Sequence, residues 1–358
     1  MKDLHGGNIY KFQREGKNDI LDYSSNINPL GVPQKFIDIA KENFDKLVNY
    51  PDPYYIELRK KISEFNSVNM DNIIVGNGAT EILFLYIRAL KPKKVLILAP
   101  CFAEYERALK SVSAKIEYFE LKESDDFYPN IINLKKEIEN NNYDLLLFCN
   151  PNNPTGQFIK LEDIKEIVKT CENKNTKIFI DEAFIEFIEN WKEKTVSLLK
   201  NKNVFIMRAF TKFFAIPGLR LGYGMGFNED ILKKMWEEKE PWTVNTFANL
   251  AGLIMLDDKE YIEKSEKWIL EEKKFMYKEL SEFQYIKAYK TECNFILIKV
   301  YNISSASLKD KMIEKNILIR DASNFKFLDY HFVRLAIKDR KSNLKMLEVL
   351  ADIMEYRG

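Results

Sequence analysis

The sequence predicts an α/β protein, with a large domain whose mainly parallel central sheet is sandwiched by helices and a smaller α+β C-terminal domain. Three observations predict this fold class. The chain has 358 residues, enough to bury the cores of more than one domain. From residue 73 to about residue 230, short apolar runs alternate with amphipathic helical stretches. Beyond residue 230, long charged helices and a few isolated apolar runs replace this alternation.

The alternating region begins with NIIVGNG at residues 72–78, which predicts a strand ending in a glycine turn. Helical spacing starts near Ala79, in ATEILFLYIRAL. Further apolar strands, each followed by polar residues, are expected at 93–100, 115–121, 143–151, 176–184 and 203–210. Helical segments such as 103–112 and 161–174 separate the strands, and this alternation predicts a mainly parallel sheet covered by helices on both faces.

The last third of the chain has a different pattern. A long charged helix is expected at 257–283, with i,i+4 charge pairs on a solvated face. Strands at 293–300, 315–321 and 331–338, followed by a helix from residue 342, then complete a small α+β domain.

The first fifty residues are expected to form an irregular arm. Pro, Gly, Asn and Asp recur in SSNINPLG and YPDPYY at a density that breaks both helices and strands. An arm this extended needs a partner surface, either its own domain or a second subunit. We therefore expect an arm at 1–40 associated with the small domain and the active site, a large domain at 41–235 and a small domain at 236–358.

Composition and charge exclude several classes of function. The formal net charge is +1, so no overall field attracts nucleic acid or an anionic membrane, and any bound anion needs a local site. No apolar run approaches the length of a membrane span, and the first residues lack the apolar core of a signal peptide. Four widely spaced cysteines and two histidines are typical of a reduced, cytoplasmic protein without structural zinc.

Polar residues follow the predicted strands at the edge where parallel sheets bind ligands, beyond the carboxyl ends of the strands. These segments are Gly76–Thr80, Pro100–Phe102, Asn150–Gly156, Asp181–Phe184 and Thr211–Lys212. The segment NPNNPTG is the most specific of them, because its prolines and asparagines form a rigid turn that fixes an amide side chain. We expect all five segments to meet at one rim.

Two residues at this rim have the chemistry of a catalytic pair, although each also has a plain structural interpretation. Lys212 lies among phenylalanines, and desolvation would favour its neutral, nucleophilic amine. The alternative is a lysine that points into water. Asp181 ends an apolar strand, where a buried carboxylate needs a partner. Its alternative is a helix N-cap.

NPNNPTG, DEAF and TKFFAIPGLRLGY, in this order, resemble fold-type I pyridoxal 5'-phosphate (PLP) enzymes of the aspartate aminotransferase superfamily. The resemblance runs from about His5 to Ala336. It implies that Lys212 forms the Schiff base with PLP and that Asp181 pairs with the pyridine nitrogen. It also implies that Asn153 donates to the phenolic oxygen. By the same resemblance, the residues that stack on the ring or hold the phosphate are Phe102, Gly78, Ala79, Thr80, Thr211 and Arg220.

The resemblance also implies a homodimer, because Tyr50 resembles the tyrosine that reaches the cofactor phosphate from the other subunit. Within the superfamily, histidinol-phosphate aminotransferases share the YP segment and two late arginines. L-threonine-O-3-phosphate decarboxylases share more, namely HGGN, SSNINPLG, CFAEYERAL, AIPGLRLGY, PWTVN and ILIRDASNF. Phe184 also favours the decarboxylases, because the aminotransferases usually carry a tyrosine there.

The decarboxylase resemblance implies a substrate that carries both a carboxylate and a phosphate. The residues that it places against this substrate are His5, Gly6, Asn26, Asn153, Arg320 and Arg334. Arginine binds the oxygens of both groups in a bidentate manner. A surface arginine at 320 and a histidine in a disordered terminus are the plain alternatives.

The expected reaction is therefore decarboxylation of O-phospho-L-threonine to (R)-1-aminopropan-2-yl phosphate for cobalamin biosynthesis. The alternatives are a histidinol-phosphate type of transamination and decarboxylation of O-phosphoserine. A PLP-fold module without catalysis is a further alternative, which the complete set of cofactor residues disfavours. The sequence departs from the family at Ala209, where a serine usually bonds the cofactor phosphate, and this predicts weaker PLP retention.

Overall fold

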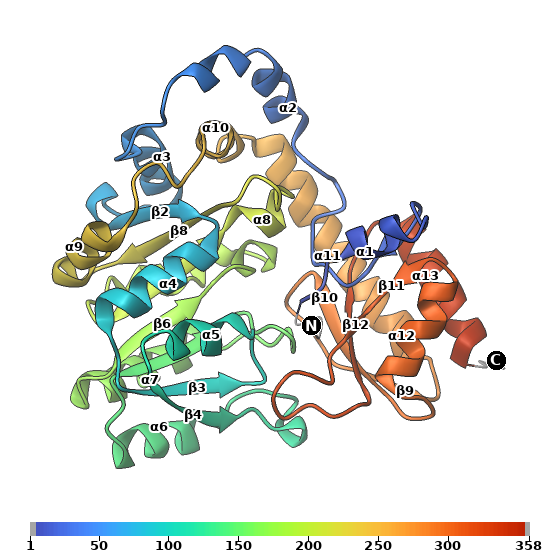
Figure 1. Cartoon of the computed structure of the whole chain (residues 1–358). Helices are drawn as coiled ribbons and strands as arrows, with labels where there is room; N and C mark the ends of the chain where they lie inside the picture. The colour runs from blue at the N-terminus through green and yellow to red at the C-terminus, as the bar shows by residue number, and fades with distance from the viewer. Residues whose placement is uncertain (1–4, 355–358) are drawn as a thin grey trace.

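The computed structural model describes residues 5–354, and its largest element is a seven-stranded sheet (Figure 1). The strand order is β2-β8-β7-β6-β5-β3-β4. The strands are β2 (Ile73–Asn77), β3 (Lys94–Ala99), β4 (Lys115–Glu120), β5 (Leu145–Cys149), β6 (Lys177–Asp181), β7 (Val204–Ala209) and β8 (Leu221–Gly226). Strand β8 alone runs in the direction opposite to the other six strands of this sheet, which confirms the mainly parallel prediction.

Strand β8 was not predicted, because its sequence LGYGMG has glycine at every second position and glycine is unfavourable in strands. The structure gives the reason for these glycines. A Cβ atom on Gly222 would lie 2.3 Å from the backbone nitrogen of Ala79, and one on Gly224 would lie 2.3 Å from the ring of Phe205. The glycines therefore let β8 approach the neighbouring helix and side chains closely.

Helices cover both faces of the sheet, as expected from alternating side-chain directions along each strand. On β5, Leu145 and Leu147 belong to one buried cluster, whereas Leu146 and Phe148 belong to the other. The helices of this part are α3 (Ile56–Asn66), α4 (Ala79–Leu90), α5 (Glu104–Lys110), α6 (Ile131–Asn140), α7 (Leu161–Asn173), α8 (Phe210–Phe213), α9 (Glu229–Glu238) and α10 (Thr246–Met255). Helices α4, α5 and α9 contribute side chains to the cluster that contains Leu145 and Leu147. Helices α6 and α7 contribute side chains to the cluster that contains Leu146 and Phe148.

A second, antiparallel sheet has the order β12-β13-β10-β9. Its elements and those packed around it are α11 (Lys259–Ser281), β9 (Ile286–Ala288), β10 (Phe295–Val300), α12 (Ser305–Glu314), β11 (Ile317–Leu318), β12 (Arg320–Asp321), β13 (Phe332–Ala336) and α13 (Arg340–Met354). This arrangement confirms the predicted smaller α+β unit. Within residues 5–354, no helix combines the length and the apolar character needed to cross a bilayer.

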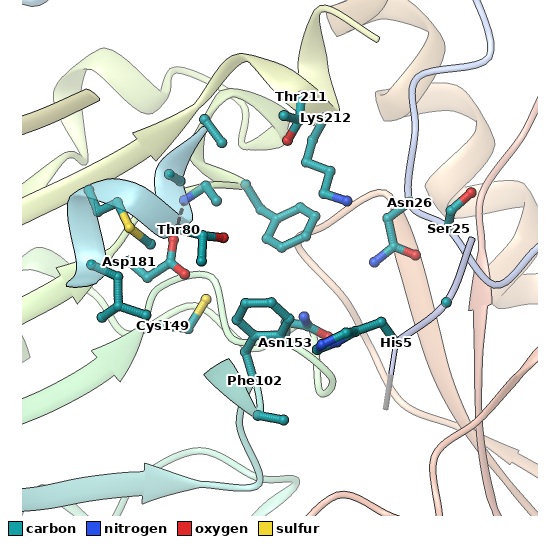
Figure 2. A pocket seen from close by; sticks show the side chains of 18 of the residues that line it. His5, Ser25, Asn26, Thr80, Phe102, Cys149, Asn153, Asp181, Thr211 and Lys212 are labelled. Atoms are coloured by element: carbon teal, nitrogen blue, oxygen red, sulfur yellow. Dashed lines mark hydrogen bonds between the residues drawn. The ribbon is translucent and has the colours of Figure 1, made fainter. Parts of the chain in front are cut away.

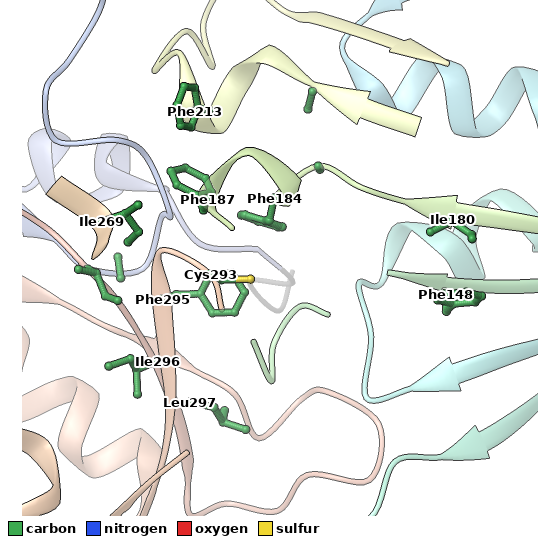
Figure 3. Packing of buried hydrophobic residues seen from close by; sticks show 14 of the residues in the cluster. Phe148, Ile180, Phe184, Phe187, Phe213, Ile269, Cys293, Phe295, Ile296 and Leu297 are labelled. Carbon is green, nitrogen blue, oxygen red and sulfur yellow. The ribbon is translucent and has the colours of Figure 1, made fainter. Parts of the chain in front are cut away.

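One buried cluster joins the two sheets (Figure 3). Ile180 lies on central strand β6, Phe184 and Phe213 lie beyond the strand ends, and Phe295 lies on β10 of the small sheet. The rings of Phe184 and Phe295 meet edge to face with their centroids 5.1 Å apart. The core therefore continues directly beneath the rim where the polar strand ends meet.

The arm is more regular than the sequence predicted. It contains α1 (Ile9–Arg14), α2 (Gln34–Lys41) and the 3₁₀ helix η1 (Phe44–Val48). The prediction of an irregular arm was wrong for these segments, because Pro33, Gly7 and Gly16 lie just outside the helices and do not interrupt them. Between the helices, β1 (Leu21–Asp22) pairs in parallel with β11.

Candidate active site

A cavity of about 240 Å³ opens beyond the carboxyl ends of neighbouring strands β5, β6 and β7 (Figure 2). Their last residues, Cys149, Asp181 and Ala209, all line it. The cavity brings together the predicted residues His5, Gly6, Asn26, Ala79, Thr80, Phe102, Asn153, Asp181, Thr211, Lys212, Arg220, Arg320 and Arg334. Of the predicted residues, all of which lie within 5–354, Gly78 and Tyr50 are not part of its lining.

Lys212 lies on the short helix α8, directly after β7, and its side chain extends into the pocket toward Asn26 (Figure 2). Phe210, Phe213 and Phe214 around it are buried. This burial, together with the positive charge of nearby arginines, lowers the pKa of Lys212 to about 8. The structure therefore places the lysine in the desolvated setting that the sequence predicted, and not in open water.

Asp181 lies opposite, at the end of β6, and is 5% exposed. The Tyr105 hydroxyl donates to Oδ2 at 2.6 Å, and the Ala183 backbone N–H donates to Oδ1 at 2.9 Å. Burial raises the pKa of Asp181 to about 6, against the opposing effect of these two hydrogen bonds. The N-cap alternative does not hold, because the 3₁₀ helix that follows, Ile185–Phe187, is preceded by Phe184.

The NPNNPTG turn is held by its own amides. The Asn150 side chain donates to the carbonyl of Ile159 and accepts from its N–H, at 3.0 and 2.7 Å. The Asn152 side chain donates to the Pro100 carbonyl at 3.1 Å. In this rigid turn, Asn153 Oδ1 accepts from Arg334 at 2.5 Å, which orients its NH₂ group, the donor end, away from the arginine.

The start of α4 and Arg220, just before β8, form one corner of the cavity. Gly78, just before α4, has φ of +79°, and a Cβ atom there would lie 2.4 Å from Arg220 Nη2. Backbone N–H groups at a helix start and a nearby arginine suit a phosphate. The side chains of Thr80 and Thr211 line the same cavity.

Two arginines come from adjacent strands of the small sheet, where Arg320 on β12 is the direct partner of Arg334 on β13. Arg334 also donates to the Ser24 carbonyl at 2.7 Å. Burial and the charge of Arg320 together lower the pKa of Arg334 to about 9. Arg320 donates to Asn324 Oδ1 at 2.7 Å and lies over the Phe325 ring, so it is not a loose surface arginine.

The arm closes the remaining side of the cavity. His5 Nε2 lies 2.8 Å from Glu104 Oε1, and the His5 ring centroid lies 5.4 Å from that of Phe102 (Figure 2). Gly6 packs so tightly that a Cβ atom would lie 2.0 Å from the Ser24 carbonyl oxygen. The alternative of a disordered terminus therefore does not apply to His5 and Gly6.

Within residues 5–354, two buried polar atoms that belong to lining residues, Asn26 Oδ1 and Arg334 Nε, lack hydrogen-bond partners. A buried polar group without a partner costs free energy, and a ligand in the cavity could supply partners for these two atoms. Both atoms belong to the part of the cavity formed by the arm and the small sheet.

Sequence reasoning missed Glu104 and Tyr105. Both lie at the start of α5 and are buried, Glu104 toward His5 and Tyr105 toward Asp181. The available signal was a pair of polar residues in the segment CFAEYERAL, directly after the predicted stacking residue Phe102. A helix in a parallel-sheet protein normally buries apolar residues, so polar residues on its buried face indicate a site.

Tyr50 is 80% exposed and packs against Trp242 in a tilted arrangement, with ring centroids 4.8 Å apart. Phe44, Leu47 and Val48 close to it in sequence are exposed as well. Its expected reach to the site of a second subunit stays a prediction.

A model of the class I and II aminotransferase family matches residues 18–350, and the chain belongs to this family. A protein of Caldanaerobacter subterraneus subsp. tengcongensis, provisionally named a threonine-phosphate decarboxylase, is 43% identical over 98% of this chain and 94% of its own. The threonine-phosphate decarboxylase of Salmonella typhimurium is 32% identical over 98% of this chain and 96% of its own. The crystal structure of the histidinol-phosphate aminotransferase from Clostridium acetobutylicum matches with a TM-score of 0.88 and 38% identity, over 94% of this chain and 99% of that chain.

PLP is the cofactor of this family, and the pocket fits it. Asp181 is a carboxylate only 5% exposed, and a cationic partner such as a pyridinium nitrogen would offset the cost of burying its charge. Lys212 has the lowered pKa of an amine that reacts with an aldehyde. The corner between Gly78 and Arg220 has the features of a phosphate site. The protein is accordingly a PLP enzyme.

Proposed function

We propose that this protein decarboxylates O-phospho-L-threonine to (R)-1-aminopropan-2-yl phosphate, a step of cobalamin biosynthesis. The observation that carries the proposal is the group of His5, Arg320 and Arg334 on one side of the cavity. Two arginines and a histidine suit the phosphate of a phosphorylated amino acid. The names of the two decarboxylase relatives support the same substrate.

We propose the following cofactor contacts. Bound PLP supplies an electron-accepting ring for the chemistry at the α carbon of the substrate. Lys212 attaches the cofactor, and Asp181 holds the proton at the ring nitrogen. Asn153 donates to the phenolic oxygen, and Phe102 packs on the ring. The backbone at Gly78–Thr80 with Thr211 and Arg220 binds the cofactor phosphate.

The substrate residues decide which bond breaks. When Arg320, Arg334 and His5 bind the side-chain phosphate, the carboxylate is left free to leave as carbon dioxide. Lys212 in its ammonium form, or a water, then donates a proton to the α carbon, where it replaces the lost carboxylate. Phe184 forms an apolar wall, 4% exposed, that offers no hydroxyl. Asn26, with its buried unpartnered oxygen, and Gly6, which brings the arm backbone close, complete this side.

We propose that each subunit is divided into the arm, the large domain and the small domain expected from the sequence. We also propose that two subunits form a homodimer with shared active sites. The exposed apolar side chains of Phe44, Leu47, Val48, Tyr50 and Trp242 support it, because large apolar side chains gathered on a surface are typical of protein interfaces. Sedimentation equilibrium of the wild type and of Val48→Asp tests it: a dimer that the variant weakens supports the interface. A wild type that sediments as a monomer contradicts it.

The second candidate is a histidinol-phosphate type of transamination. The observation that favours it is the match to the Clostridium acetobutylicum aminotransferase, at 38% identity. The two reactions differ in what they consume and release, so one assay separates them.

The experiment supplies purified, PLP-loaded protein with O-phospho-L-threonine and measures carbon dioxide with and without 2-oxoglutarate. We expect release that needs no keto acid. Glutamate formation that depends on 2-oxoglutarate, with no carbon dioxide, would establish transamination in its place. O-phosphoserine in a parallel assay measures discrimination for the methyl group, worth about 1–3 kcal/mol. Faster turnover of O-phosphoserine would reassign the substrate.

A further inference from the structure

A buried tyrosine holds the carboxylate that faces the cofactor ring. We infer that Tyr105 is a positioning residue, whose hydroxyl keeps the proton shared by Asp181 and the cofactor on the ring nitrogen and not on the carboxylate. The inference concerns a residue of α5 that sequence reasoning left without a role, and it applies to any reaction that the bound PLP supports.

The geometry around Asp181 is that of a carboxylate held in its ionised form. The distance of 2.6 Å from Tyr105 Oη to Asp181 Oδ2 lies in the range of charge-assisted O–H···O⁻ bonds. Ala183 N–H occupies the other oxygen at 2.9 Å. A carboxylate oxygen accepts more than one hydrogen bond, so each still has capacity for the ring N–H.

The titratable groups that act on Asp181 are Tyr105, Glu182 and Lys212, and Asp181 acts in turn on Cys149. Tyr105 is fully buried, and burial raises its pKa well above 10, so it stays a donor at all working pH values. Burial likewise keeps the Cys149 thiol protonated, because it raises the thiol pKa. Glu182 raises the pKa of Asp181, and Lys212 lowers it. Among the side chains, Tyr105 is the hydrogen-bond donor that opposes the effect of burial.

The consequence follows from a competition for one proton. Burial increases the proton affinity of Asp181, and a carboxylate of high proton affinity takes the proton from the ring nitrogen. The Tyr105 hydrogen bond lowers that affinity, so the ring remains a pyridinium and accepts electrons. Tyr105 also packs edge to face on Phe102, with ring centroids 5.7 Å apart, so a phenylalanine at 105 retains this packing and removes only the hydroxyl.

The experiment compares Tyr105→Phe with Tyr86→Phe, a control tyrosine that is 1% exposed in the same cluster and packs on Phe205. In the cofactor-free proteins, ¹³C carboxyl NMR follows the Asp181 titration, with the signal assigned by its loss in Asp181→Asn. In the PLP-loaded proteins, ¹⁵N-labelled PLP reports whether the ring nitrogen carries the proton.

For Tyr105→Phe we expect the midpoint of the Asp181 titration to move up by about one pH unit. The free energy of one hydrogen bond to a charged group corresponds to a pKa shift of roughly this size. The ¹⁵N signal should move toward that of a neutral pyridine. Tyr86→Phe should change neither signal. An unchanged Asp181 midpoint and an unchanged ¹⁵N signal in a folded Tyr105→Phe protein would overturn the inference.

Site-specific replacement of Tyr105 by 3,5-difluorotyrosine keeps the test decisive if Tyr105→Phe does not fold. The fluorinated phenol is a stronger donor, so the Asp181 midpoint should move down, opposite to the change in Tyr105→Phe. A midpoint that stays in place, or that moves up, would overturn the inference in the same way.

Discussion

The two sides of the pocket differ in how completely the protein satisfies its own polar groups. On the side formed by the central sheet, both oxygens of Asp181 accept protein hydrogen bonds, and Asn150 and Asn152 of the NPNNPTG turn bind backbone groups. On the side formed by the arm and the small sheet, Asn26 Oδ1 and Arg334 Nε are buried without partners among residues 5–354. The first side has its polar groups paired within the protein, and the second keeps two polar atoms that a ligand could pair with.

This difference separates two tasks. A cofactor that stays bound needs fixed partners, so the central side is preorganised by backbone and amide hydrogen bonds. A substrate that enters and leaves needs groups that gain partners only on binding, which leaves part of the binding energy for the reacting complex. Variants on the two sides should therefore separate cofactor binding from substrate turnover.

The largest expected effect is that of Lys212→Ala. Without the amine, PLP has no covalent attachment, and turnover should fall by about 10³-fold or more, since the proton-transfer group is lost as well. The visible absorbance band that borohydride abolishes in the wild type should be absent. Lys177→Met, a change at a partly buried lysine of β6, is the matched control and should keep the band. A borohydride-sensitive band in Lys212→Ala would assign the attachment to another lysine.

On the other side, Arg334→Gln should separate the two tasks. Loss of a buried, hydrogen-bonded charge typically costs 2–5 kcal/mol, so we expect kcat/KM for the phosphorylated substrate to fall by about 10²-fold. The PLP dissociation constant should change much less, because Arg334 reaches the proposed cofactor contacts only through Asn153. Arg340→Gln, which breaks the half-exposed contact with Glu272 on α11, is the control. If Arg334→Gln weakened PLP as strongly as it slowed turnover, the two sides would not be independent.

The sequence predicted the cofactor side well for a physical reason. Cys149, Asp181 and Ala209 end neighbouring parallel strands, and the ends of parallel strands meet at one edge wherever the fold is formed. Motifs of consecutive residues, such as NPNNPTG, carry most of their geometry with them. The strand pattern therefore predicted both the large sheet and the rim of the site.

The other side depends on contacts between segments that are far apart in sequence. His5 meets Glu104, and Arg334 meets both Ser24 and Asn153, across separations of 99 to 310 residues. Local patterns hold no information on such pairings. Resemblance predicted which residues would gather there, but not the partners that hold them.

The rate of PLP uptake should depend on pH through the protonation of Lys212. Burial lowers the pKa of Lys212 to about 8, so below that pH most of the lysine is an ammonium ion that cannot attack the aldehyde. The rate of PLP uptake, followed by absorbance after mixing, should rise about tenfold from pH 6 to pH 7 and level off above pH 8. Arg334 also lowers this pKa, so Arg334→Gln should move the curve to higher pH. Uptake that is independent of pH over this range would contradict a desolvated lysine.

The smallest expected effect is that of Ala209→Ser, within the cofactor side. Ala209 ends β7, lines the pocket and lies three residues before Lys212, so a hydroxyl there would face the corner between α4 and Arg220. One added hydrogen bond of about 0.5–1.5 kcal/mol should tighten PLP binding by roughly two- to tenfold, with an unchanged KM for substrate. Ala103→Ser, on the wall next to Phe102, places a hydroxyl elsewhere in the same cavity and serves as the control. An unchanged PLP dissociation constant in Ala209→Ser would show that the cofactor phosphate does not approach the end of β7, and the proposed corner between α4 and Arg220 would have to hold it alone.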